Sequence, residues 1–314
     1  MKLTNFSLTM TLLLASGEAM AQWTPRVPSA TCEMATDGTE QYLYNTEAGG
    51  FFAGANDWGT RASINEKGDL IKVIPTEDEM YNLACYPSTK EQWLYVSCNN
   101  FDAMWVDAPN QTGNQEYPNT DMWMFEKNAS GTYTITNWGI DPSFPFGMSE
   151  SYNGVSGNTR LFLYDPEATY VANDEEMPSF AGKFYSEWVF IDSEEYQILQ
   201  PKVETYMVSQ RLKAAVDNVK ATDPQYDASG LMAVYGNTSS TTEEMEGAIE
   251  VTNALMSFYR AYQKNTEAYP SLDFSAQKAV YDNPASLLSD IETAEKGMLT
   301  VKQQLQRHPC SGKV

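Results

Sequence analysis

A glycine-flanked turn carries the residues of this sequence that are best suited to chemistry. Asn56, Asp57 and Trp58 follow one another there, so an amide, a carboxylate and a large aromatic ring share one short segment. Sugar sites combine these groups, because an aromatic face stacks on apolar C–H bonds while polar groups bond the hydroxyl rim. In the structural alternative, Trp58 covers one end of a β fold and the two polar side chains bond their own backbone. A second, weaker set of the same kind consists of Asn99, Asn100 and Trp105.

Catalysis would have to depend on carboxylates. His308 is the single histidine, which argues against a histidine base or a multi-histidine metal site. Glycoside hydrolysis needs two Asp or Glu residues about 5–10 Å apart, but no spacing in the sequence selects a pair. One acidic cluster that could hold Ca²⁺ consists of Asp165, Glu167, Asp174, Glu175 and Glu176. It lacks the alternation and the glycine of a calcium loop, which favours a solvated acidic loop. We predict a non-enzymatic protein with no metal or cofactor, and keep a carboxylate-based glycoside hydrolase as the weakest alternative.

The net charge of the chain limits the classes of partner that it can bind. The 20 Lys and Arg residues face 42 Asp and Glu residues, which gives a formal net charge of −22. Such a charge repels phosphate backbones and anionic lipid surfaces, so we expect no nucleic-acid partner and no binding to the membrane surface. No stretch after the first residues is apolar enough to cross a membrane, so we expect no membrane insertion. Since 42% of the residues are hydrophobic, the 314 residues can form buried cores, and the length suggests two domains.

The first residues are typical of a secretory signal. Lys2 precedes a short apolar run, and Ala19-Met20-Ala21 has the small-x-small pattern of a cleavage site. We therefore predict a signal peptide over residues 1–21 and an exported protein, secreted or at the cell surface. The remaining chain contains four cysteines, which allow three pairings in an oxidising compartment: Cys32, Cys85, Cys98 and Cys310. Cys85 and Cys98 flank neighbouring strand-like runs and are the favoured pair, while Cys32 and Cys310 either pair or stay free.

An internal repeat predicts the fold of the first two thirds. Residues 42–45, 94–97 and 146–149 share strand-like alternation, and their last residues are separated by 52 and again by 52 positions. A second matching set lies at 69–73, 121–125 and 186–190, and a third at 81–83, 133–135 and 196–198. The longer third unit implies an inserted segment. Three units of short strands predict a β-trefoil over residues 36–200, with a three-bladed or sandwich arrangement as the alternative.

Two of these units carry a further motif. Trp123 and Trp188 lie in an x-x-Trp-x-aromatic pattern that resembles the Gln-x-Trp signature of ricin-type trefoils, although the glutamine is absent. Residues 49–60 also resemble a motif of multidomain surface proteins of anaerobic gut bacteria, in which a ricin-like trefoil precedes helical modules. The resemblance implies carbohydrate binding, with an aspartate near the start of each functional unit bonding the sugar. Asn45, Ser97 and Ser149 occupy that position here, so Asn45 joins Asn56, Asp57 and Trp58 as a candidate ligand-binding residue, and the other two units are expected to be scaffold.

The last third has helical periodicity. Three mostly apolar stripes lie at 208–219, 245–262 and 287–305, and a short phrase at 233–237 recurs 46 residues later at 279–283. We expect three helices to pack as a small bundle, with repeated units that resemble helical spacer modules of bacterial adhesins.

These patterns predict an all-β domain followed by an all-α domain. The predicted organisation is a signal peptide (1–21), a linker (22–35), a ricin-like β-trefoil (36–200) and a helical module with a short tail (201–314). The expected function is non-catalytic binding of an extracellular glycan. The rival prediction is a structural adhesin segment that contacts a surface protein without binding sugar.

Overall fold

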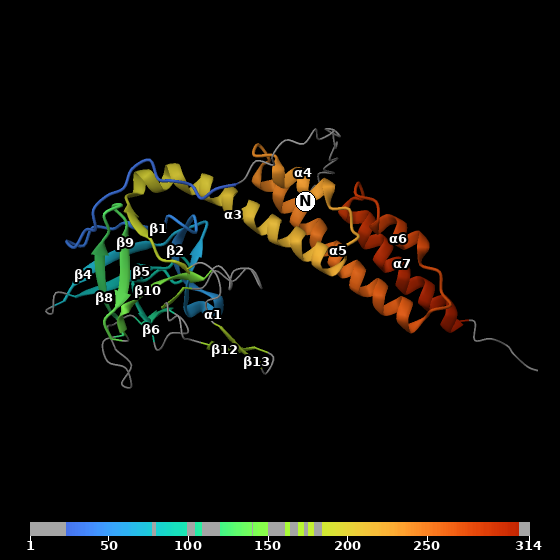
Figure 1. Ribbon diagram of the computed structural model, residues 1–314, viewed down its shortest axis with the longest axis horizontal. Coiled ribbons are helices and arrows are strands. Elements are labelled where there is room, and N and C mark those ends of the chain that lie inside the picture. Colours follow the sequence, from blue (N-terminus) through green and yellow to red (C-terminus); the bar gives the residue numbers. More distant parts are fainter. Residues whose placement is uncertain are drawn as a thin grey trace, which may run out of the picture. The chain divides into compact units, whose positions relative to one another are not determined.

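The computed structural model describes residues 23–76, 80–98, 104–108, 120–139, 141–149, 161–163, 169–172, 175–178 and 184–307. The predicted signal peptide and Cys310 lie outside these residues. Two compact units are present (Figure 1): a β unit over Thr24–Met207, and a helical unit made of Trp23 and the residues from Val208 onward. The division falls inside one long helix, later than the predicted boundary after residue 200.

The β unit is built on a large antiparallel sheet (Figure 1). Its strands are β1 (Tyr42–Asn45), β2 (Gly50–Asn56), β3 (Arg61–Asn65), β4 (Leu70–Pro75), β5 (Tyr81–Tyr86), β6 (Leu94–Cys98), β7 (Met104–Ala108), β8 (Met122–Lys127), β9 (Tyr133–Asn137), β10 (Asp141–Ser149), β11 (Phe162–Leu163), β14 (Phe184–Tyr185) and β15 (Trp188–Ile191). A short helix, α1 (Asp57–Thr60), connects β2 to β3. Two further strands, β12 (Thr169–Ala172) and β13 (Glu175–Pro178), pair only with each other among the described residues.

The strand pairings repeat along the chain. The strands that open the second and third units pair with the strand that closes the unit before, β6 with β5 and β10 with β9, whereas β1 of the first unit pairs with β15. The pairings run from β9 through β15, β1, β2, β3, β7, β6, β5 and β8 back to β9. Tyr44, Val96 and Met148, which the repeat makes equivalent, all lie in strands, and Tyr44 and Val96 are fully buried.

Two tryptophans organise the core of this sheet. Trp123 and Trp188 are completely buried, and their indole N–H groups donate to the Val96 and Phe146 carbonyls at 2.9 and 3.2 Å. Phe146 packs against both rings, with centroids 5.4 and 5.0 Å away. Burying a side chain of this size stabilises the fold by about 1.5–3 kcal/mol, and the satisfied indoles avoid the cost of an unpaired buried donor.

The third repeat departs from the prediction. Tyr196–Ile198, which we expected to be its closing strand, belong to the first turns of helix α3 (Ser193–Thr222). Asp192 accepts the Glu195 N–H at 2.9 Å, and Glu194 and Glu195 place negative charge in the first turn. Both features favour a helix start over a strand.

A segment from the other end of the β unit takes the missing place. Val73 pairs with Leu83 and Phe125 with Ile135, whereas the equivalent Phe190 pairs with Cys32, whose N–H donates to the Phe190 carbonyl at 2.9 Å. We call residues 24–41 the N-terminal strap. The strap therefore occupies the position that closing strands fill in the other two units.

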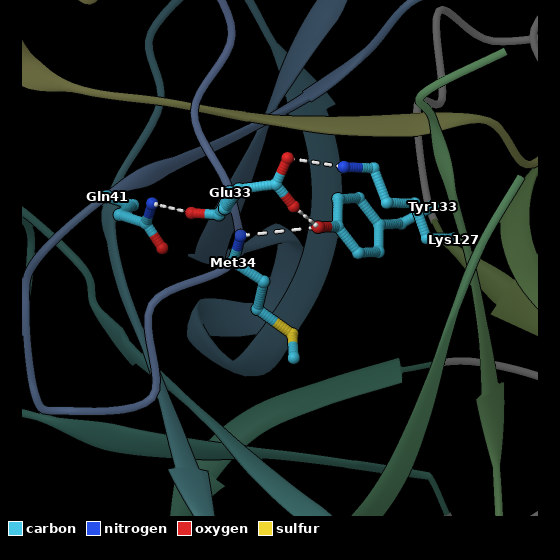
Figure 2. A network of polar contacts seen from close by, with 5 residues as sticks. All are labelled: Glu33, Met34, Gln41, Lys127 and Tyr133. Atoms are coloured by element: carbon cyan, nitrogen blue, oxygen red, sulfur yellow. Dashed lines mark hydrogen bonds and ion pairs between the residues drawn. The ribbon is translucent and has the colours of Figure 1, made fainter.

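Polar contacts hold the strap on the sheet (Figure 2). The Tyr133 hydroxyl donates to the Glu33 carboxylate at 3.0 Å and accepts the Met34 N–H at 3.3 Å. The Lys127 ammonium forms an ion pair with the same carboxylate, and within the strap Gln41 donates to the Glu33 carbonyl at 2.7 Å. These contacts lower the pKa of Glu33, chiefly through Lys127 and then through Tyr133.

The expected Cys85–Cys98 disulfide is not formed. Cys85 and Cys98 are free, buried thiols, and Cys32 is a free, half-buried one. Cys85 lies opposite Leu94 in the β5–β6 ladder, so Cys98 is four residues farther along its strand. That offset is about 13 Å, well beyond the span of about 4.4–6.8 Å that a disulfide allows between Cα atoms.

The helical unit contains more helices than the three predicted. After α3 come α4 (Ser229–Gly236), α5 (Thr242–Ala268), α6 (Ser275–Tyr281) and α7 (Leu288–Arg307) (Figure 1). The repeated phrase at 233–237 and 279–283 lies at the ends of the two short helices α4 and α6. Among the described residues, no helix is both long and apolar enough to span a membrane.

The repeat of 46 residues extends to individual hydrogen bonds. Ser240 and Ser286 each donate to the carbonyl of a valine six residues earlier, at 2.8 and 2.6 Å. Asp227 and Asp273 each accept the N–H of a serine two residues later, at 2.9 and 2.8 Å. The unit is therefore a tandem pair of short-helix, turn and long-helix modules, α4–α5 and α6–α7.

Candidate functional site

The turn with the candidate sugar-binding residues connects β2 to β3. Asn56 ends β2 and pairs with Arg61 at the start of β3, and Asp57–Thr60 form α1 between them. Gly59 has a φ of +72°, which a residue with a side chain rarely adopts, so glycine suits the end of this turn. The side chains of Asn56, Asp57 and Trp58 lie outside the described part of the structure, and their contribution to a site stays a prediction.

Asn45 does not belong to an accessible site. Its side chain is completely buried. The amide donates to the Tyr185 carbonyl at 3.1 Å, and the amide oxygen accepts the N–H groups of Glu47 and Ala48 at 3.1 and 2.8 Å. These bonds shape the turn between β1 and β2, so Asn45 acts on the fold and cannot contact a ligand without leaving them.

A tryptophan and an arginine lie next to the turn. Arg61 pairs across the strands with Trp105 of β7, and its guanidinium carbon is 3.9 Å from the centroid of the Trp105 ring. Arg61 is largely buried, whereas Trp105 is half-buried. The pair combines an aromatic ring with a cation that stacks on it, an arrangement that fixes the ring in place. Trp105 belonged to the weaker predicted set, and its companions Asn99 and Asn100 lie outside the described residues.

A buried carboxylate positions the turn and a neighbouring loop. Asp69 accepts the Gly54 N–H of β2 at 2.8 Å and the Ser88 N–H at 3.1 Å. Burial raises the pKa of Asp69, and the two backbone donors oppose that rise. Asp69 thereby holds the loop at 87–93 beside the end of β2. The proximity is close, since a Cβ on Gly59 would lie 3.4 Å from the Lys90 ammonium.

The sequence contains a signal for Asp69. Asp69 and Asp121 open matching segments of the repeat, and both are buried. Periodicity alone does not distinguish a buried aspartate from a solvated one. A charged residue that recurs at a buried position needs hydrogen-bond partners, and this requirement could have identified Asp69 as a structural anchor.

Three features lie together in this part of the β unit. They are a turn with a predicted amide, carboxylate and indole, a half-buried Trp105 held by Arg61, and a cation on the adjoining loop. Among the described residues, no group of three or more His, Cys, Asp or Glu side chains is placed to hold a metal ion. No protein-family model matches the chain, and no curated protein is significantly similar to it.

Proposed function

We propose that this is an exported, non-catalytic carbohydrate-binding protein whose ligand contacts the turn at 56–60 and Trp105. The observation that carries the proposal is the half-buried Trp105 ring, held by the Arg61 guanidinium at 3.9 Å beside that turn. A sugar ring would stack on the aromatic surface, and the turn would supply groups for its hydroxyls.

The arrangement of the β unit supports a ricin-like trefoil as the fold behind this function. Opening strands pair with the preceding closing strands in the same way in the second and third units. Trp123 and Trp188 also occupy matching buried positions, opposite Tyr81 and Tyr133. A pseudo-threefold trefoil accounts for this repetition, with the strap substituting for one strand.

A spacer in an adhesin is the second candidate function. It is favoured by the tandem modules of the helical unit, whose turn hydrogen bonds recur at a spacing of 46 residues. Such modules can extend a chain without any ligand. In that function, the β unit would contact a surface protein and bind no sugar.

A glycan array probed with residues 22–314 tests the proposal. If the ring stacks on a sugar, Trp105→Ala loses about 1–3 kcal/mol of binding, or roughly five- to 150-fold in affinity. Trp58→Ala and Asp57→Ala test the turn in the same way. The control is Trp138→Ala, because Trp138 is 45% exposed and lies between β9 and β10, away from this turn in the chain.

Thermal melting of each variant separates binding from folding. Lost binding with an unchanged melting temperature supports the site. A buried Trp58 would instead leave a cavity and lower stability by about 3–5 kcal/mol. If the wild type binds no glycan on the array, the spacer function is the better account.

A further inference from the structure

Aromatic side chains continue from Trp105 along the outer face of β6. In β6 the residues alternate between buried and half-buried, with Leu94, Val96 and Cys98 buried. Tyr95 and Ser97 therefore face outward, and so does Trp105, which pairs with Ser97 across the ladder. Trp93, which precedes β6, is also half-buried.

The row ends in a pair of rings. Tyr86 at the end of β5 meets Trp93 edge to face, with centroids 5.4 Å apart. We call Trp105, Tyr95, Trp93 and Tyr86 the aromatic strip. From Ser97, opposite Trp105, to Trp93 is four residues, or about 13 Å of extended strand. The strip is therefore longer than one sugar ring.

Charged groups accompany the far end of the strip. The Lys72 ammonium lies 4.0 Å from the centroid of the Trp93 ring and 3.0 Å from a carboxylate oxygen of Glu40. Lys72 belongs to the same row as Tyr95, since both pair with the small Ala84 between them. An ammonium offers only donors and a carboxylate only acceptors, so together they can bond neighbouring hydroxyls of one sugar.

The strip is continuous with the site already proposed. The loop at 87–93 places Lys90 beside the turn and ends at Trp93. Asp69 holds the start of this loop, because it accepts the Ser88 N–H at 3.1 Å. Two of the loop's own backbone bonds fix it further, because Lys90 and Glu91 both donate to the Pro87 carbonyl. One extended ligand can therefore contact the turn site and the strip together.

We propose that the ligand is an oligosaccharide or polysaccharide chain, with the aromatic strip as a second subsite for sugar units that follow the one at Trp105. This inference rests on the proposed carbohydrate-binding function and adds the length of the ligand to it. Each ring supplies an apolar face for one sugar unit, while the Lys72–Glu40 pair bonds hydroxyls at the distal end. Contacts made by linked units add to the affinity without a second entropic cost of association.

The test compares chain lengths on the same protein. Immobilised di-, tetra- and hexasaccharides of glucose, galactose and N-acetylglucosamine serve as probes for residues 22–314. For the linkage that binds, the hexasaccharide should bind at least about tenfold more tightly than the disaccharide. Trp93→Ala should remove this gain and leave the disaccharide unchanged, whereas Trp105→Ala should weaken both. Trp138→Ala should change neither.

Several outcomes would overturn the inference separately from the proposed function. Equal affinity for short and long chains, or an equal loss for both lengths in Trp93→Ala, leaves a single-sugar site and no second subsite. Tyr86→Ala and Tyr95→Ala repeat the test if Trp93→Ala fails to fold in a thermal melt. Binding to immobilised mucin that survives periodate oxidation of its sugars would assign the strip to a protein partner. The absence of any binding to the sugar probes would remove the proposed function as well.

Discussion

The two units of this protein differ in where they place part of their aromatic residues. In the β unit, Trp93, Tyr95 and Trp105 face outward along β6 and β7. In the helical unit, the ring centroids of Tyr226 and Phe258 each lie 5.2 Å from that of the buried Tyr281, and the three rings form part of the core of this unit. Both units are repeats rich in aromatic residues, and in the β unit half-buried rings form a row along one face of the sheet. The comparison teaches that aromatic content alone does not indicate a binding surface.

The units also differ in how their repeats are completed. In the helical unit, the turn of each module is held by hydrogen bonds between residues close together in the chain, such as those that Ser240 and Ser286 donate. The β unit is closed by pairings between distant residues, including Cys32 with Phe190. A sheet of this kind depends on all its repeats together, whereas helical modules gain stability from neighbours. The following predictions test that difference.

The largest effect is expected in the core of the β unit. Trp123→Ala removes a fully buried ring and its bond to the Val96 carbonyl, and should lower the free energy of unfolding by about 3–5 kcal/mol. Urea unfolding followed by circular dichroism measures this, with the far-ultraviolet helical signal reporting the other unit. Trp138→Ala is the matched control and should stay within about 0.5 kcal/mol of the wild type. A similar loss in both variants would contradict the assigned core.

A smaller effect should be confined to the helical unit. The Tyr281 hydroxyl donates to the buried Asp223 carboxylate at 3.1 Å, so Tyr281→Phe leaves a buried charge with one donor fewer. We expect a loss of about 1–3 kcal/mol in the helical transition. Tyr235 lies one repeat earlier, and its backbone carbonyl accepts the Trp23 indole, so Tyr235→Phe keeps that contact and should have little effect. Equal losses of stability in Tyr281→Phe and Tyr235→Phe would show that both tyrosine hydroxyls stabilise their modules equally.

The start of each long helix permits a finer comparison. Thr241 caps α5 with a complete capping box with Glu244, whereas Leu287 at the equivalent position before α7 supplies no hydroxyl. Thr241→Ala should therefore cost about 0.5–2 kcal/mol. Leu287→Thr should stabilise α7, because Leu287 is 46% exposed and Asp290 already bonds its N–H. Thermal melts of both variants check the prediction, and destabilisation by Leu287→Thr would refute it.

The smallest effect is the pH dependence of the strap. Because the pKa of Glu33 is lowered by Lys127 and Tyr133, its contribution is present above the ordinary carboxyl range and is lost as the pH falls through the lowered pKa. The protection of the Met34 N–H against hydrogen exchange, taken relative to the intrinsic rate at each pH, should fall over that acidic range, because this N–H donates to Tyr133. Glu33→Gln should show lower protection at neutral pH and a smaller change in protection on acidification. Unchanged protection in the wild type would mean that other contacts hold the strap.

Asp69, in the same unit, should change the stability with pH in the opposite direction to Glu33. Burial raises its pKa, so its protonated form is favoured by folding and its contribution is lost as the pH rises through the raised pKa. The charge of Asp69 in turn helps to raise the pKa of the Tyr42 and Tyr196 phenols and of the Cys85 thiol, so these titratable groups lie near it. The free energy of unfolding of Asp69→Asn and of the wild type, measured over mildly acidic pH, should separate the contribution of Asp69 from that of Glu33.

Much of the architecture was predictable from local patterns. The spacing of 52 residues located opening strands with Tyr44 and Val96 in buried positions, and the spacing of 46 located the repeated helical modules. Both succeed because side-chain periodicity reports which face of an element is buried. The number of helices was wrong because the short phrases at 233–237 and 279–283 are too brief to show a helical period.

The candidate site was less predictable. Asn45 was included through its place in the repeat, but a buried amide with three backbone partners is a turn residue, and burial is not visible in a spacing. Trp93 and Tyr86 were missed because they become neighbours only when β5 pairs with β6. The Cys85–Cys98 pair was wrong for the same reason, since the register of that ladder sets the thiols apart.

The sequence by itself determined the periodic features of this protein: the repeats, the alternation within strands and the helix caps that Thr241 and Glu244 supply. These depend on residues close together in the chain, whose contacts follow from backbone geometry. Only the tertiary structure decided that Cys32 closes the third unit opposite Phe190, and that Trp105, Tyr95 and Trp93 line one outer face. Such contacts join distant segments, and which segments meet depends on the register and closure of the whole sheet, because each strand can pair on either edge and local periodicity does not choose its partner.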